Sequence, residues 1–123
     1  MRYVTLQEAI HIHEILLKAH GGAAGIRDRG LIEAALLRPQ TGYYADLMEE
    51  AAALWESLAM NHGFVDGNKR VAFACMEIFL DLNGFELTAG EEETIRFIYD
   101  RLESGTFTKD TLDAWLRAHT APS

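Results

Sequence analysis

The sequence predicts an all-α fold, a compact single-domain bundle of about six helices with a short flap, over residues 1–123. Apolar residues recur at helical spacing in successive segments. Glycine and asparagine mark the turns between these segments, and no long linker, repeat or low-complexity tract interrupts the series. A chain of 123 residues that is 49% apolar and 24% charged suits one globular unit with a real core.

Two helices are expected in the first third of the chain. The first follows the capping box Thr5–Glu8 and stops at Gly21–Gly22. The second is shorter and covers Leu31–Leu37. It should close at Arg38–Pro39, because the residue before a proline avoids helical dihedral angles. Residues 40–45 then form a loop.

Four further helices complete the predicted bundle. The third covers Asp46–His62, and a turn rich in glycine follows over Gly63–Gly67. The fourth runs from about Asn68 to Leu82 and is almost wholly apolar in its middle, so we expect it to be the buried central helix. The fifth begins near Glu91, and the sixth extends from Thr108 to about His119.

Charge and cysteine content exclude several classes of protein. A net charge of −8 repels a polyphosphate backbone, so we expect no direct binding of nucleic acid and a phosphate site only where one is built locally. The one cysteine, Cys75, lies in an apolar run and suits a small buried side chain in a reducing compartment. The chain starts without a signal-peptide core and has no apolar stretch of the ~20 residues that span a bilayer. These features predict a cytoplasmic protein without membrane contact.

The stretch from Asn61 to Arg70 combines several parts of a phosphate site. The first turn of the helix that follows exposes unpaired backbone N–H groups and the positive end of the helix dipole, which favour a bound anion. Gly67 lets a ligand approach the backbone closely, while Lys69 and Arg70 add positive charge. The sequence therefore predicts a nucleotide site at this turn.

Two side chains of the same stretch each have two interpretations. A carboxylate at Asp66 repels a phosphate unless a cation lies between them, and one aspartate together with phosphate oxygens is enough to hold Mg²⁺. Alternatively, Asp66 caps the fourth helix. The imidazole of His62 suits a general base at cytosolic pH, although a single histidine is more often structural. Lys69 and Arg70 have the alternative of being ordinary solvated charges at a helix start.

The string from His62 to Arg70 resembles the signature loop of the Fic/Doc family, His-x-Phe-x-Asp/Glu-Gly-Asn-x-Arg, and meets all six of its fixed positions. Segments Gly25–Leu31 and Leu36–Pro39 resemble upstream segments of Doc-type proteins. The resemblance implies that His62 deprotonates a target hydroxyl, Asp66 holds Mg²⁺, Arg70 neutralises charge at the reacting phosphate and Phe64 anchors the loop. It also implies the nucleotide-binding residues Gly67, Asn68, Lys69 and Arg70.

The resemblance favours one reaction among three candidate functions. Family members that transfer AMP carry a small residue after the asparagine and a second arginine, where this chain has Lys69 and Ala74. Its Asn-Lys-Arg is similar to the Doc branch of toxins, which transfer the γ-phosphate of ATP to a Ser/Thr hydroxyl of elongation factor Tu and so block translation. The alternatives are AMP transfer and a non-catalytic helical module that binds a nucleotide or a partner.

Three other features carry predictions. His11 and His13 stand two apart on a helix and point to different faces, so we expect structural or solvent-facing roles and no shared metal. The residues Thr41, Gly42, Tyr43 and Tyr44 are expected to form a flap that pairs with a substrate backbone, or alternatively to pack their rings under a loop. The chain has no evident inhibitory motif, and the resemblance implies an antitoxin of the Phd type whose disordered tail folds into a groove.

Overall fold

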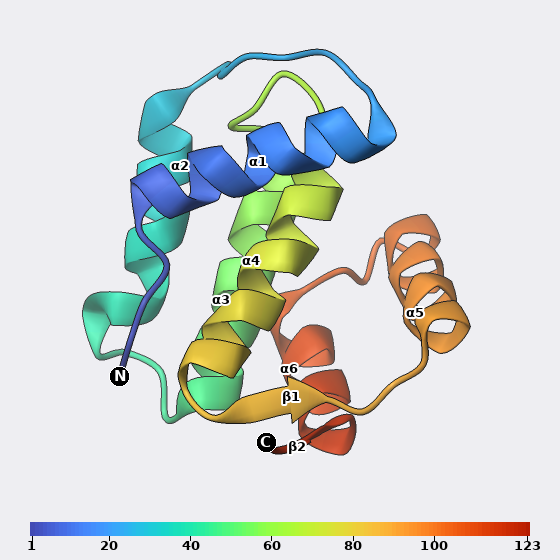
Figure 1. The fold of residues 1–123 in the computed structure, drawn as a ribbon. Helices are drawn as coiled ribbons and strands as arrows, with labels where there is room; N and C mark the ends of the chain where they lie inside the picture. The colour runs from blue at the N-terminus through green and yellow to red at the C-terminus, as the bar shows by residue number, and fades with distance from the viewer.

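Helices are the main elements of the structure, a computed structural model that describes residues 1–123 (Figure 1). The elements in chain order are α1 (Leu6–His20), α2 (Arg29–Leu37), the 3₁₀ helix η1 (Arg38–Thr41), α3 (Leu47–Met60), α4 (Asn68–Leu82), β1 (Phe85–Leu87), α5 (Glu91–Glu103), α6 (Lys109–Ala118) and β2 (Thr120–Pro122). The prediction of an all-α fold with six α-helices is confirmed. The only sheet is the antiparallel pair of β1 and β2, in which Phe85 lies opposite Pro122.

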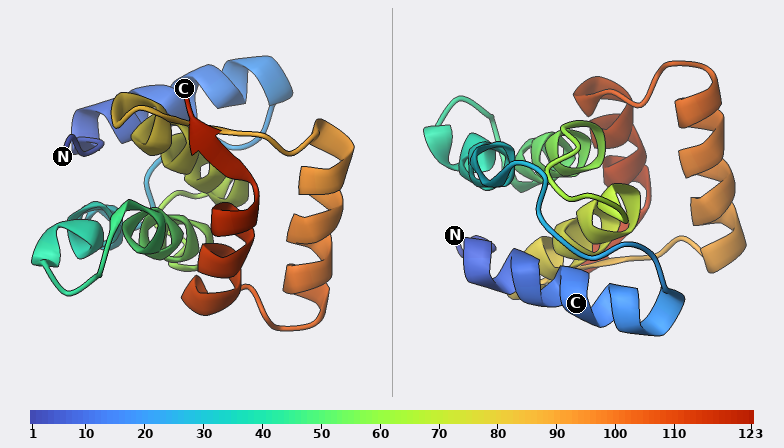
Figure 2. Two further views of the ribbon diagram at one scale, coloured as in Figure 1. Left: turned by 90° about the horizontal axis from the view of Figure 1, so that it is seen from below. Right: turned by 90° about the horizontal axis from the view of Figure 1, so that it is seen from above.

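Helices α3 and α4 lie side by side at the centre, with α1, α2 and α6 around them (Figures 1 and 2). Alanines on α3 bring the two backbones close together, and α4 buries six of its residues completely: Val71, Ala72, Cys75, Met76, Phe79 and Leu80. These side chains belong to one core cluster of 22 residues. The prediction that the fourth helix is buried and central is therefore confirmed.

The ends of the first two helices follow from capping chemistry. Thr5 and Glu8 form the predicted capping box of α1, because each side chain accepts a hydrogen bond from the backbone N–H of the other residue. Helix α2 begins at Arg29, two residues before the predicted start, because Asp28 caps it through Leu31 N–H at 3.2 Å.

Helix α2 ends at Leu37 as predicted, but the predicted reason for its end is wrong. Arg38 keeps helical dihedral angles (φ −51°, ψ −48°), and the chain continues from α2 into η1 instead of opening into a loop. The Arg38 guanidinium donates to Glu56 and Ser57 of α3, both at 2.7 Å, and to the Tyr44 hydroxyl at 2.6 Å. These tertiary contacts outweigh the local preference of a residue before proline.

The backbone of helix α5 stands away from the central pair of helices (Figure 2). Its only buried residue is Thr94, and Phe97 stacks on Trp115 of α6 with ring centroids 4.6 Å apart. None of the helices has the length and apolar character required to cross a membrane.

Candidate active site

The loop between α3 and α4 begins with a strained residue, His62. Its φ of +54° lies in the left-handed region, and His62 is the one non-glycine residue there. Such a conformation costs about 1–3 kcal/mol and persists only where the surroundings hold it. Arg27 supplies part of that hold, because its Nε donates to the His62 carbonyl oxygen at 2.6 Å. The imidazole itself is exposed at the rim of a cleft.

The segment before α2 is paired with this loop. Ile26 and Phe64 form an antiparallel bridge, and Val65 N–H donates to the Gly25 carbonyl at 3.1 Å. Gly63 accepts from the N–H groups of Arg27 and Asp28 at 2.8 and 2.9 Å. A side chain at Gly63 would collide with Ile32 of α2, so the close approach requires glycine. The loop is thus held along one edge by residues 25–28.

The other edge of the loop is fixed by Phe64 and Asn68. Phe64 is 1% exposed and belongs to the core, as the anchoring role of this residue requires. Asn68 is 9% exposed, and its side chain accepts from Phe64 N–H and donates to Phe64 C=O, both at 3.0 Å. Both polar atoms of the Asn68 side chain are therefore engaged by the loop, and its backbone N–H is free to meet a phosphate.

The first turn of α4 presents three free donors. Gly67 is the N-cap in the left-handed conformation (φ +77°), and the first helical hydrogen bond runs from Val71 N–H to Gly67 C=O at 3.0 Å. The N–H groups of residues 68–70 have no acceptor in the protein. They face a cleft of about 420 Å³ lined by His62, Val65, Asp66, Gly67, Asn68, Lys69, Arg70 and Tyr99. All predicted catalytic, nucleotide-binding and metal residues thus meet in one place.

Asp66 does not cap α4, so that alternative is wrong. One carboxylate oxygen accepts from Gly67 N–H at 2.8 Å, and the other accepts from Ala23 N–H at 3.0 Å. The hydrogen bonds from Ala23 and Gly67 lower the pKa of Asp66, and the positive charge of Arg70 acts in the same direction. The carboxylate is therefore ionised at neutral pH and faces the cleft.

The donor set suits a magnesium ion bound together with phosphate. No three His, Cys, Asp or Glu side chains cluster to hold a metal on their own. Mg²⁺ does not need such a cluster, since one or two carboxylates and substrate phosphates usually hold it. The Asp66 carboxylate has about four lone-pair sites and uses one on each oxygen for a backbone N–H, so it retains acceptor capacity for an ion.

The predicted flap lies elsewhere. Thr41–Tyr44 precedes α3, whereas His62 follows it, and the 14 residues of that helix extend about 21 Å at ~1.5 Å per residue. The two segments stand at opposite ends of α3 (Figure 1). Tyr44 is held there by Arg38, and Tyr43 is 84% exposed. The predicted flap residues Thr41–Tyr44 therefore do not lie beside the loop, which is paired instead with residues 25–28, and docking of a target on Thr41–Tyr44 stays a prediction.

Three contributors to the site were not predicted from the sequence. Tyr99 reaches the cleft from α5, and Ala23 supplies a backbone donor to Asp66. No sequence pattern marks either one. His13 lies under the loop with 4% exposure, whereas His11 is exposed, so the expected structural or solvent-facing roles of this pair are confirmed with one residue in each role.

The sequence that forms the loop and the helices around it matches a known family. A model described as the Fic/DOC family matches residues 3–80, which is more than half of the chain. The chain belongs to the Fic/DOC family. It is similar to Toxin Doc of Mycolicibacterium smegmatis, with 49% identity over 76 residues that cover 58% of each protein. It is also similar to Protein kinase doc of Escherichia phage P1, with 33% identity over 91 residues, covering 71% of this chain and 72% of that one. The chain thus spans little more than half of the Mycolicibacterium relative.

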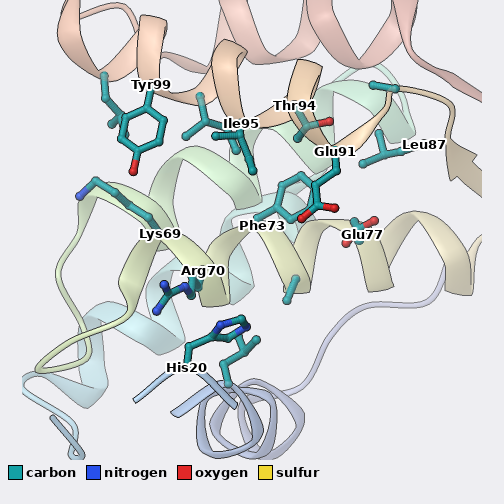
Figure 3. A pocket seen from close by; sticks show the side chains of 15 residues that line it. His20, Lys69, Arg70, Phe73, Glu77, Leu87, Glu91, Thr94, Ile95 and Tyr99 are labelled. Carbon is teal, nitrogen blue, oxygen red and sulfur yellow. The ribbon is translucent and has the colours of Figure 1, made fainter. Parts of the chain in front are cut away.

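An apolar groove adjoins the cleft of this Fic/DOC chain. It has a volume of about 610 Å³ and lies between α5 on one side and α4 with the end of α1 on the other (Figure 3). Lys69, Arg70 and Tyr99 line both hollows. The cations lie at the end near the loop, and Glu77 and Glu91 lie at the other end. Burial raises the pKa of the Glu77 carboxyl, and the nearby Asp81 charge adds to the effect.

Proposed function

We propose that this protein is a toxin of the Doc type that transfers the γ-phosphate of ATP to a Ser/Thr hydroxyl of a protein. The observation that carries the proposal is the meeting of His62 with the free N–H groups of α4 in one cleft. A base at the rim and an anion site at the floor are what in-line phosphoryl transfer requires. The names of the two relatives, one a toxin and the other a protein kinase, agree with it.

The proposed reaction uses four groups of the chain. His62 takes the proton of the target hydroxyl, whose oxygen then forms a bond to the γ-phosphorus. The bond from that phosphorus to the β,γ-bridging oxygen breaks, and ADP leaves with the electron pair. Arg70 and the N–H groups of the first turn of α4 oppose the negative charge on the transferring phosphoryl oxygens. Asp66 would hold Mg²⁺, which supplies charge neutralisation to the phosphates.

Phosphorylation is favoured over AMP transfer by two residues. Lys69 adds a cation beside the helix N-terminus, in the position that a small residue takes in AMP-transferring members. Ala74 lines the groove one turn after Arg70 and offers no charge to a third phosphate. The triphosphate thus lacks the second arginine that holds the γ-phosphate away from the target. AMP transfer is the second candidate, because the loss of one contact also leaves that orientation chemically accessible.

The proposed target is elongation factor Tu, modified in the cytoplasm. The proposed restraint is an antitoxin of the Phd type whose tail folds in the apolar groove. The groove suits a segment with one apolar face and a basic residue directed at Glu77, because a cation there would offset the negative charges of Glu77 and nearby Asp81. Replacing Glu77 by Gln is expected to weaken antitoxin binding. Glu86→Gln changes an exposed residue of β1 that does not line the groove, and should leave the affinity unchanged.

The decisive experiment compares His62→Ala with His11→Ala, both at exposed histidines. Each variant is incubated with ATP, Mg²⁺ and elongation factor Tu, and the target is weighed intact. The wild type and His11→Ala should add a phosphoryl group, and His62→Ala should add nothing while still binding ATP. A mass increase of the target by one adenylyl group would refute the kinase proposal in favour of AMP transfer. Full transfer by a folded His62→Ala protein would favour a non-catalytic binding module and a contaminating kinase.

A further inference from the structure

We propose that His13 of α1 is a positioning residue for the cleft: it fixes the Asp66–Gly67 peptide and thereby aims the metal-binding carboxylate and the first turn of α4. The inference rests on the proposed function for its catalytic consequence. His13 lies outside the loop and lines neither hollow. Its role follows from its contacts with two loop residues, Phe64 and Asp66.

The His13 ring is held in one orientation. Its side chain is 4% exposed, and the imidazole stacks on Phe64 with ring centroids 3.9 Å apart and planes inclined by 18°. Phe64 is in turn held at both backbone polar groups by Asn68. The imidazole can therefore change neither its position nor its tilt without moving the loop.

His13 Nε2 contacts the Asp66 carbonyl oxygen at 2.8 Å. A carbonyl oxygen only accepts, so Nε2 carries the proton and donates, whether the ring is neutral or cationic. Without His13 this oxygen would lose its partner beneath the loop, since no other hydrogen bond reaches it. The contact is thus directional and cannot be replaced by apolar packing alone.

The direction of that carbonyl sets the direction of the next donor. In a trans peptide the C=O and N–H groups point in opposite directions. Because the Asp66 carbonyl points to His13, the Gly67 N–H points away from His13. There it donates to a carboxylate oxygen of Asp66 at 2.8 Å and holds the side chain over the cleft. The Gly67 Cα lies against the same ring, since a Cβ on it would come within 3.6 Å of His13 Nε2. The N-cap of α4 is therefore seated on His13.

Three variants separate this role from simple core filling. His13→Phe keeps an aromatic ring on Phe64 and removes the donor. His13→Gln loses the ring and keeps an amide N–H that reaches the position of Nε2. His11→Phe, two residues away on the exposed face of the same helix, is the matched control. The readouts are kcat and KM for Mg·ATP, and the backbone amide chemical shifts of the nucleotide-free protein.

We expect His13→Phe to lower kcat roughly tenfold to a hundredfold, the scale of a small misplacement of catalytic groups. His13→Gln should recover most of this loss, and His11→Phe should match the wild type. The amide shifts of residues 66–70 should move in His13→Phe and stay near their wild-type values in His13→Gln. Equal kcat in His13→Phe and His11→Phe, or equal loss in His13→Phe and His13→Gln, would overturn the inference.

The outcome for His13 is independent of the outcome for the proposed function. A wild-type protein that transfers nothing to any target refutes the kinase proposal. The amide shifts still decide on His13 in that case, because they report the loop without nucleotide or target. Unmoved shifts at residues 66–70 in His13→Phe would then refute the positioning role, and moved shifts that His13→Gln restores would support it.

Discussion

Replacing Asn68 by Ala should release the loop from α4. The side chain makes two hydrogen bonds of 3.0 Å to the backbone of Phe64, and both residues are buried. The substitution leaves one N–H and one C=O without a partner, each at a cost of about 1–3 kcal/mol. The better helix propensity of alanine stabilises the folded protein by a few tenths of a kcal/mol. We therefore expect the free energy of unfolding to fall by about 2–5 kcal/mol.

Urea unfolding followed by far-ultraviolet circular dichroism measures that loss, with Asn61→Ala as the control. Asn61 is the C-cap of α3 at the other end of the same loop, and its side chain makes no hydrogen bond. Its replacement should change the free energy of unfolding by no more than about 0.5 kcal/mol. If Asn68→Ala unfolds at the same urea concentration as Asn61→Ala, the Asn68 side chain does not fasten the loop, and its assignment as a phosphate ligand regains weight.

Asp66→Asn should abolish the Mg²⁺ dependence of nucleotide binding in titration calorimetry, and an unaltered magnesium dependence would contradict the metal role. The substitution should also lower the melting temperature modestly, because an amide has one acceptor oxygen for the two N–H groups of Ala23 and Gly67. Since hydrogen bonds lower the pKa of Asp66, the carboxylate stays charged as the pH falls to its ordinary value of 3.8, so Mg²⁺-dependent binding should be constant between pH 6 and 8. Gly63→Ala should cost about 1–3 kcal/mol of unfolding free energy because its methyl group collides with Ile32. Gly90→Ala has open space around it and should cost less than about 1 kcal/mol, because alanine is the weaker N-cap of α5. Equal melting temperatures of the two variants would refute the clash. Burial raises the pKa of the Cys75 thiol to about 12, so the folded protein should not react with a thiol reagent at pH 8, and rapid labelling without denaturant would contradict its burial.

Helix bounds were predictable where local signals stand on both sides. Helix α4 begins at Asn68 and ends at Leu82 as predicted, because Gly67 precedes it and Asn83–Gly84 follows it. Helix α3 ends at Met60, two residues before the prediction, because Asn61 is its C-cap and His62 takes the left-handed conformation that ends a helix. The short strands β1 and β2 carry no pattern of their own, since three residues are too few to show alternation.

The site was predictable only within the loop itself. Its residues are consecutive in sequence, so their proximity is assured before the chain folds. Contacts from other elements depend on how the helices pack, which no spacing reveals. The two tyrosines before α3 looked suited to a flap, but the direction of that helix carries them to the far end of the molecule. His13 differs from His11 only by facing the core.

The shared lining of the cleft and the groove has a thermodynamic consequence. Lys69, Arg70 and Tyr99 face both hollows, so a ligand in one meets side chains whose charge or position the other ligand also uses. Linkage makes this effect reciprocal. If a groove ligand lowers the affinity for nucleotide by some factor, bound nucleotide lowers the affinity for the groove ligand by the same factor. A groove ligand that draws Lys69 or Arg70 away from the cleft would therefore be displaced in turn by an anion bound there.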